Sequence, residues 1–313
     1  MARRLKNNYN SIESEIDNFF KNMQENKVIS TGINNFDQIL NGGILNGLYV
    51  IGSMPSFGKT DFINQIADNI AKQGYDILFF SYQMRREELI LRSLCRKIFL
   101  LNPKKNRNIE TINIMRKECD ENLMKQGLEY YKKNISKTMF IIEGDFKTGV
   151  KEIKDKVERH IRLRQKKPVV IIDYLQAIKP LDFKMSDKQK NDYNLLELKK
   201  IVKDFNIPIL CLSSQSRDRY LKQAYYDSFK DTGNIEDVAD IAVYLQFKNL
   251  AEQFRSGTEV EKIRKAYELK NQYPRKLELL LLKNRNGLDH NIDYLYYYYK
   301  NNYFSSDRIK EGI

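Results

Sequence analysis

The segment Tyr49–Thr60 constrains the fold of this chain more than any other stretch. It reads YVIGSMPSFGKT: an apolar run, a loop of small residues, and then Gly-Lys-Thr. This is the layout of a phosphate-binding P-loop, in which backbone N–H groups and the dipole of the following helix attract phosphates. Lys59 would reach the β- and γ-phosphates of a nucleotide, and the Thr60 hydroxyl would hold Mg²⁺. The predicted nucleotide-binding residues are Ser53, Pro55, Ser56, Gly58, Lys59 and Thr60.

One position departs from the usual P-loop pattern. Ser53 stands where the pattern has glycine, and Gly52 lies one place earlier. Serine fits if the backbone there does not need a positive φ. The alternative is a Gly-Lys-Thr turn that binds no ligand, but the flanking strand and helix patterns favour the nucleotide site. ATP and Mg²⁺ are therefore the expected cofactors.

Length and composition allow one large α/β domain, alone or with a small extension. The 313 residues are 42% hydrophobic, which is enough for a full core. Ile12, Ile16, Phe19, Phe20 and Met23 recur at helical spacing, so we predict an amphipathic helix and linker over residues 1–29 and the main domain over 30–313. The sequence shows neither an apolar run long enough to span a membrane nor a signal region, so a cytoplasmic protein without membrane contact is expected.

The balance of charges permits a nucleic-acid partner without requiring one. Lys and Arg number 54 against 41 Asp and Glu, a net charge of +13. A basic surface attracts nucleic-acid phosphates, but AT-rich coding would also enrich lysine. Cys95, Cys119 and Cys211 are odd in number and scattered, which argues against a disulfide framework or a zinc site.

Apolar runs alternate with helical patterns along most of the chain. Runs that predict strands occupy 76–81, 139–143, 168–173, 207–212, 241–245 and 277–282, and 291–304 is typical of an aromatic strand or edge hairpin. Because the strands are apolar throughout and helices separate them, we predict an α/β fold with a mostly parallel central sheet covered by helices on both faces. The tyrosines of 291–304 are expected to pack rather than to stack on bases.

Five sequence blocks carry a resemblance to a known family. The apolar run before Asp173 ends in the block IDYLQ, which supplies a carboxylate of the kind that holds a P-loop metal. The other blocks are FSYQM (80–84), LSSQSR (212–217), TGNIE with Ala239-Asp240 (232–240), and KNRNG (283–287). Together they resemble the C-terminal RecA-like ATPase domain of DnaB-type replicative helicases over about residues 30–304. The family's N-terminal helical domain is not expected here, since only the linker-like helix precedes the motor.

The resemblance implies roles in ATP hydrolysis. Lys59 and Thr60 would bind phosphate and metal, and Asp173 would hold Mg²⁺ through water. Lys283 and Arg285 resemble the basic pair that one subunit offers to its neighbour's γ-phosphate, which makes hydrolysis depend on ring assembly. A solvated charge pair after a strand is the alternative for these two residues.

The resemblance also implies a loop that follows single-stranded DNA. Arg217, Lys222, Lys230 and Gly233 are the candidate DNA-binding residues, with tyrosines between them. Basic residues interleaved with aromatics suit a single strand, although they would equally suit a flexible solvated loop. Asp231 stands where those helicases carry Glu, a mild departure.

Gln83 is the departure that matters most. The family carries Glu there, as the base that activates the attacking water, and losing a general base typically costs about 10²–10⁴ in rate. A Gln can still orient water, as in small GTPases. Alternatively, Glu87 or Glu88 could supply the carboxylate. Ser214 also replaces the family's Gln, which puts γ-phosphate sensing in doubt.

These observations predict a ring-forming ATPase, with a hexamer as the expected ring, that translocates on single-stranded DNA as a DnaB-like helicase. A primase or a helicase loader would be a partner. An accessory oligomer that binds ATP and DNA with little hydrolysis is the alternative favoured by Gln83. A RecA- or KaiC-like ATPase that does not unwind DNA is a second alternative, against which the DYLQ and KNRNG blocks argue.

Overall fold

The structure is a computed structural model that describes residues 12–14, 16, 27–145, 148–216, 219–287 and 292–309. Within the predicted N-terminal helix it describes only the short 3-10 turn η1 (Ile12–Ser14) and Ile16. The rest of that prediction lies outside the described residues.

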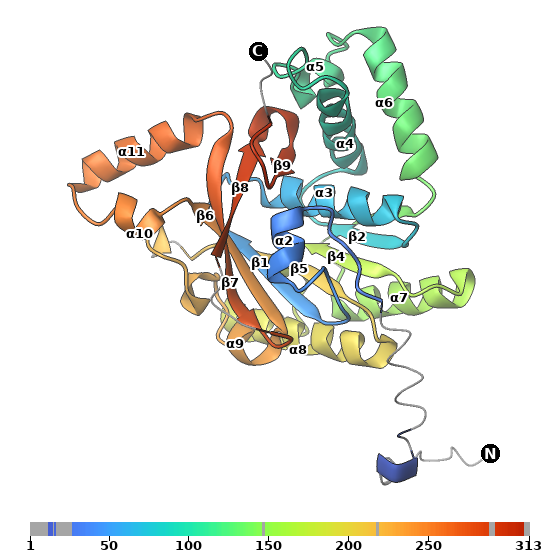
Figure 1. The fold of residues 1–313 in the computed structure, drawn as a ribbon. Helices are drawn as coiled ribbons and strands as arrows, with labels where there is room; N and C mark the ends of the chain where they lie inside the picture. Colours follow the sequence, from blue (N-terminus) through green and yellow to red (C-terminus); the bar gives the residue numbers. More distant parts are fainter. Residues whose placement is uncertain are drawn as a thin grey trace.

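One sheet organises the described chain (Figure 1). Its strands are β1 (Leu48–Ser53), β2 (Ile77–Ser81), β3 (Met139–Glu143), β4 (Val169–Asp173), β5 (Ile209–Ser213), β6 (Ile241–Phe247), β7 (Arg275–Asn284), β8 (Ile292–Tyr298) and β9 (Tyr303–Ser305). They lie in the order β3-β2-β4-β5-β1-β6-β7-β8-β9. The pairs from β3 to β6 are parallel, and β7, β8 and β9 are added antiparallel. The predicted α/β fold with a mostly parallel sheet is confirmed.

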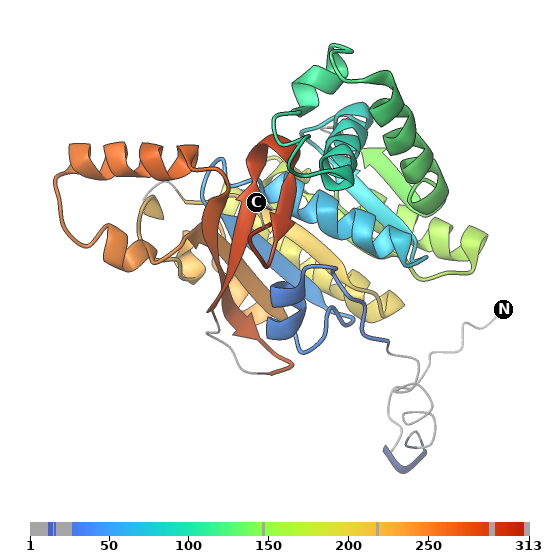
Figure 2. The same cartoon turned by 45° about the horizontal axis from the view of Figure 1, so that its top comes forward.

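Helices cover both faces of the sheet. They are α2 (Asn34–Ile39), α3 (Lys59–Lys72), α4 (Arg86–Leu101), α5 (Thr111–Met115), α6 (Glu121–Asn134), α7 (Val150–Arg164), α8 (Asp187–Phe205), α9 (Ile235–Val238), α10 (Leu250–Gln253) and α11 (Glu259–Asn271). Single 3-10 turns are η2 (Leu175–Ala177), η4 (Tyr226–Ser228) and η5 (Tyr299–Asn301). α3, α4 and α6 lie on one side of the sheet and α7, α8 and α9 on the other (Figures 1 and 2). Among the described residues, no helix combines the length and the apolar character that crossing a bilayer requires.

The burial of the strands follows from this layering. Every residue of β1, β2, β4, β5 and β6 is buried, as continuous apolar runs in a doubly covered sheet should be. β3 is apolar but only half-buried because it forms an edge of the sheet. The other edge is the hairpin of β8 and β9, where Tyr297 and Tyr298 are buried. Tyr297 stacks on Phe304 at 4.1 Å between ring centroids, so at these positions the tyrosine run packs as predicted.

The charged insertion between β6 and β7 forms α10 and α11. α11 extends away from the sheet in both views (Figures 1 and 2). Its base is anchored by aromatic packing, since Phe254 stacks on Phe247 at 6.0 Å and Phe247 contacts Phe57 of the P-loop at 4.6 Å. The insertion therefore rests against the loop at the carboxyl end of β1.

Candidate active site

The loop after β1 has the backbone geometry of a phosphate cradle. Gly58 has φ +74° and Ser56 φ +66°, whereas Ser53 is the last residue of the strand and needs no positive φ. A Cβ on Gly58 would overlap the Tyr297 hydroxyl, so only glycine fits there. α3 begins at Lys59, which places the N-terminus of a 14-residue helix at the loop.

A cleft of about 550 Å³ opens in front of this loop. Five predicted nucleotide-binding residues line it (Ser53, Ser56, Gly58, Lys59 and Thr60), while Pro55 is an exposed residue of the same loop. The far wall comes from α4, α5, β7 and the β8–β9 hairpin, through Arg92, Thr111, Arg275, Tyr299 and Asn302. The volume is within the range of small-molecule sites.

Thr60 and Asp173 meet at the floor of the site. The Thr60 hydroxyl donates to Asp173 Oδ2 at 2.8 Å, across 113 residues of sequence. Burial raises the pKa of the Asp173 carboxyl, against the Thr60 hydrogen bond and the charge of Lys59. Burial likewise lowers the pKa of the Lys59 ammonium, and Asp173 opposes that shift. A phosphate beside Lys59 and a divalent cation beside Asp173 would each oppose the effect of burial, so both fit these residues.

Gln83 lies on the same cleft. It follows β2, is exposed, and belongs to the lining together with Met84. Neither Glu87 nor Glu88 is among the described residues that line the cleft, and both lie in the first turn of α4. The structure therefore brings Gln83 to the P-loop as the sequence predicted, and it leaves the two alternative carboxylates outside the cleft wall.

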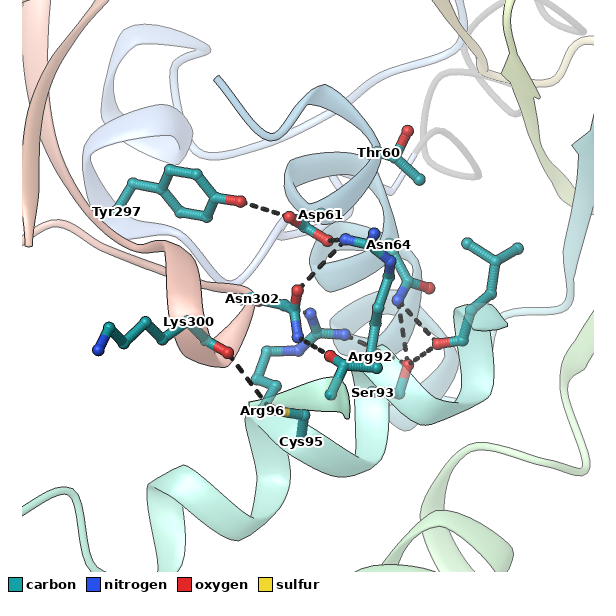
Figure 3. A network of polar contacts seen from close by, with 12 residues as sticks. Thr60, Asp61, Asn64, Arg92, Ser93, Cys95, Arg96, Tyr297, Lys300 and Asn302 are labelled. Carbon is teal, nitrogen blue, oxygen red and sulfur yellow. Dashed lines mark hydrogen bonds and ion pairs between the residues drawn. The ribbon is translucent and has the colours of Figure 1, made fainter. Parts of the chain in front are cut away.

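Two ion pairs between α3 and α4 were not predicted from the sequence, and Figure 3 shows the first of them. Arg92 pairs with Asp61, the residue after Thr60, and Asp61 also accepts from the Tyr297 hydroxyl. Arg92 further donates to Asn302 at 3.2 Å. One turn along α4, Arg96 pairs with Asp68. The spacing of the charges was the available signal. Asp61 and Asp68 are seven residues apart and so lie on one face of α3, and Arg92 and Arg96 are four residues apart and so lie on one face of α4.

Arg275 ties the P-loop to the C-terminal strands. Its guanidinium donates to the carbonyl of Ser56 at 2.7 Å and lies over the Tyr299 ring, 4.2 Å from the centroid. The position of the loop backbone therefore depends on β7 and η5, which come from the last fifth of the chain.

Lys283 and Arg285 lie near the amino ends of the parallel strands, at the end of the sheet opposite the P-loop. Lys283 pairs with Ala242 at the start of β6, whereas Ser53 pairs with Leu245 further along the same strand. Three or four residues of strand separate these levels by about 10–13 Å. Lys283 donates to the carbonyl of Glu236, and Arg285 pairs with Asp240 at 3.2 Å. Neither residue lines the P-loop cleft of its own chain.

Comparison with known proteins assigns this chain to a family. The family model of the DnaB-like helicase C terminal domain matches residues 28–305. The chain belongs to this family. It is 30% identical over 269 residues to a probable replicative DNA helicase of Trieres chinensis, covering 83% of this chain and 53% of that protein. It is 26% identical to the replicative DNA helicase DnaC of Bacillus subtilis strain 168, covering 83% and 52%. The chain thus spans about half the length of the curated relatives it matches.

Solved structures agree on the fold. One solved ATPase domain superposes with a TM-score of 0.75 at 19% identity, covering 94% of this chain and 98% of that one. A DnaB-like replicative helicase, solved in a study of its interactions with primase, also gives a TM-score of 0.75, at 18% identity and covering 94% and 68%. The RecA-like ATPase fold and the resemblance carried by the sequence blocks are confirmed.

In this DnaB-like domain, Lys230 is hydrogen-bonded to the residue after β5, and Gly233 is hydrogen-bonded to the N-terminal half of α8. The N–H of Lys230 donates to the carbonyl of Ser214 at 2.7 Å. The N–H of Gly233 donates to Asp192 Oδ1 at 2.9 Å. An acidic side chain thus occupies the backbone donor that the resemblance assigns to DNA, and a phosphate would have to displace it.

Two described residues of the predicted DNA loop make contacts within the chain. Arg219 pairs with Asp227, and the Tyr226 hydroxyl donates to the carbonyl of Leu282 at 2.7 Å. Lys222 is exposed, and Arg217 lies outside the described residues.

The block at 212–217, where Ser214 replaces the family's Gln, lies apart from the cleft at the positions that bear on γ-phosphate sensing. Neither Ser214 nor Gln215 is among the described residues that line the cleft. Gln215 instead donates to the carbonyl of Arg219 at 3.0 Å.

Proposed function

We propose that this chain is the motor of an ATP-dependent DnaB-like helicase that moves on single-stranded DNA as a ring-shaped homo-oligomer, with a hexamer as the expected ring. The observation that carries the proposal is the division of the site. Thr60 and Gln83 line one cleft, where Thr60 also bonds to Asp173, whereas Lys283 and Arg285 lie at the opposite end of the parallel strands. A second copy of the chain that presents its Lys283 and Arg285 to this cleft would complete the site.

The chain's own residues would divide the work as follows. Lys59 and the N–H groups of α3 hold the phosphates of ATP, and Thr60 and Asp173 hold Mg²⁺ and its water shell. The bound Mg²⁺ neutralises charge on the phosphate oxygens. Gln83 orients the attacking water but cannot accept its proton, so hydrolysis is real but slow. Arg285 of the neighbouring subunit stabilises the charge that develops on the transferred phosphoryl group.

An accessory oligomer that binds ATP and DNA but scarcely hydrolyses is not favoured. The reported relatives are replicative helicases, and the P-loop, Thr60 and Asp173 are all in place here. A primase is proposed as a partner because one structural neighbour, a DnaB-like replicative helicase, was solved in a study of its interactions with primase. A helicase loader is the other partner that the family resemblance suggests.

Replacing Lys59 with alanine is expected to weaken ATP·Mg²⁺ binding by about 10- to 100-fold or more, since a charge-assisted hydrogen bond to phosphate is removed. Assembly into rings should weaken with it. Isothermal titration calorimetry and analytical ultracentrifugation measure both effects. Lys72→Ala, an exposed lysine at the other end of α3, is the matched control. Equal nucleotide affinity for wild type and Lys59→Ala would remove the P-loop from the proposal.

Replacing Arg217, Lys222 and Lys230 together with alanine is expected to weaken binding to single-stranded DNA and to lower its salt dependence. The slope of log affinity against log salt should fall by about one unit for each phosphate that the protein no longer neutralises. Fluorescence anisotropy at several salt concentrations gives this slope. The control removes the same charge elsewhere, at the exposed Lys132, Lys133 and Lys137. If both triple variants behave alike, the basic loop has no special part in DNA binding.

A further inference from the structure

A phenyl ring stands in solvent on the segment that joins η2 to α8. Phe183, between η2 and α8, is 81% exposed, the most exposed large apolar side chain among the residues that the structure describes. Its neighbour Leu181 is 69% exposed. Packing within this chain does not account for a ring so little buried.

Hydrogen bonds join the segment that carries Phe183 to the loop of Lys230. Gln176, in η2, accepts from the N–H of Ser214 at 3.1 Å and donates to the carbonyl of Lys230 at 2.9 Å. The side chain of Gln176 therefore clamps the start of the segment to both sides of the loop.

The other end of the segment is joined to the same loop through α8. Asn191 donates to the carbonyl of Asp231 at 3.0 Å, and Asp192 accepts from Gly233. Phe183 lies between these two attachments, four residues before α8 begins, so the segment that carries it is joined to the described part of the loop on both sides of the ring.

The charges of this segment favour an anionic partner. Lys179 lies 5.9 Å from the centroid of the Phe183 ring, and Lys184 and Lys188 form no ion pair with any described residue. Asp187 pairs with Lys190 at 2.9 Å, whereas Asp182 accepts only a backbone N–H, from Lys184 at 2.9 Å, and keeps its charge. Residues 176–192 carry four lysines against three aspartates, which leaves the segment with a net positive charge. An exposed ring flanked by unpaired lysines is the combination that holds a base on its face and a phosphate beside it.

We propose that Phe183 stacks on a base of the bound single strand, while Lys179 and Lys184 contact the adjacent phosphates. The inference rests on the proposed function and extends its DNA site to a second segment, from which none of the sequence-predicted contacts comes. Stacking is tolerant of sequence because every base has a π-face, so the contact suits a translocating motor. Phe183→Ala should lower affinity for oligo(dT) about 5- to 100-fold, and Phe183→Tyr should retain it.

The chain contains no tryptophan, so Phe183→Trp creates a single fluorescent reporter. Its emission should be quenched when oligo(dT) binds the full-length oligomer with ATP·Mg²⁺ present, and blunt duplex DNA should quench it less. The matched control is Tyr267→Trp on α11, where the tyrosine is 69% exposed. Its emission should not respond to oligo(dT).

The outcomes separate the two proposals. If wild type fails to bind oligo(dT), the proposed helicase function fails and this inference with it. If wild type binds but Phe183→Ala binds equally well and Phe183→Trp is not quenched, only the stacking role is overturned. A third outcome is that Phe183→Ala no longer assembles into the ring-shaped oligomer in ultracentrifugation, while Phe183→Trp is not quenched. That result would make Phe183 a contact between subunits and would also overturn the stacking role.

Discussion

Gln83→Glu is expected to raise the rate of ATP hydrolysis by about 10²-fold or more, which is the range a general base supplies. Gln83 lies on the cleft that Lys59 and Thr60 line, so a carboxylate there would reach the water that attacks the γ-phosphate. The side chain keeps its shape and gains one negative charge. Nucleotide affinity should therefore fall only slightly, and the gain should appear in kcat, measured by steady-state phosphate release with and without single-stranded DNA.

Two further variants identify the base if Gln83 is not its site. Glu87→Gln and Glu88→Gln remove the alternative carboxylates, and neither should change the rate because both residues lie outside the cleft wall. A fast wild-type rate that Gln83→Glu leaves unchanged and Glu87→Gln lowers would assign the base to α4. A low rate in every variant would indicate a site whose other parts are also impaired, and would favour the accessory role.

The regular part of the fold was predictable because its signal is local. The strand predicted at 139–143 has the bounds that the structure gives it. Apolar strands between amphipathic helices permit few architectures other than a covered parallel sheet. The positions of the P-loop after β1 and of Asp173 at the end of β4 were also predictable, because each follows from an apolar strand.

What the sequence did not reveal depends on pairing between distant segments. Asp61 and Arg92 are 31 residues apart, and either would pass for a surface charge until α3 and α4 are packed together. Arg275 reaches the P-loop from 219 residues away, through the antiparallel strands whose register no local pattern sets. Phe183 reads as one more apolar residue in sequence, and only its exposure in the fold marks it.

Arg285→Ala is expected to lower the rate of ATP hydrolysis by about 10³-fold or more, because an arginine finger typically supplies about 10³–10⁵ in rate. The measurement belongs in the Gln83→Glu background, where the starting rate is high enough to fall. Nucleotide binding should stay normal, since Arg285 lies at the end of the sheet away from its own cleft and pairs there with Asp240. Arg285→Lys keeps the charge but not the planar fork, and should recover only part of the rate.

Mixing two inactive variants tests whether Arg285 acts between subunits. In the Gln83→Glu background, Lys59→Ala subunits lack a working P-loop but carry Arg285, and Arg285→Ala subunits have the reverse defect. Mixed rings place some intact P-loops against intact arginines, so activity should reappear on mixing and peak near equal amounts. An Arg285 that acted within its own chain would give no recovery at any ratio. The register of β7 explains why recovery should require ring assembly. It places Lys283 and Arg285 about 10–13 Å along the sheet from the P-loop of their own chain.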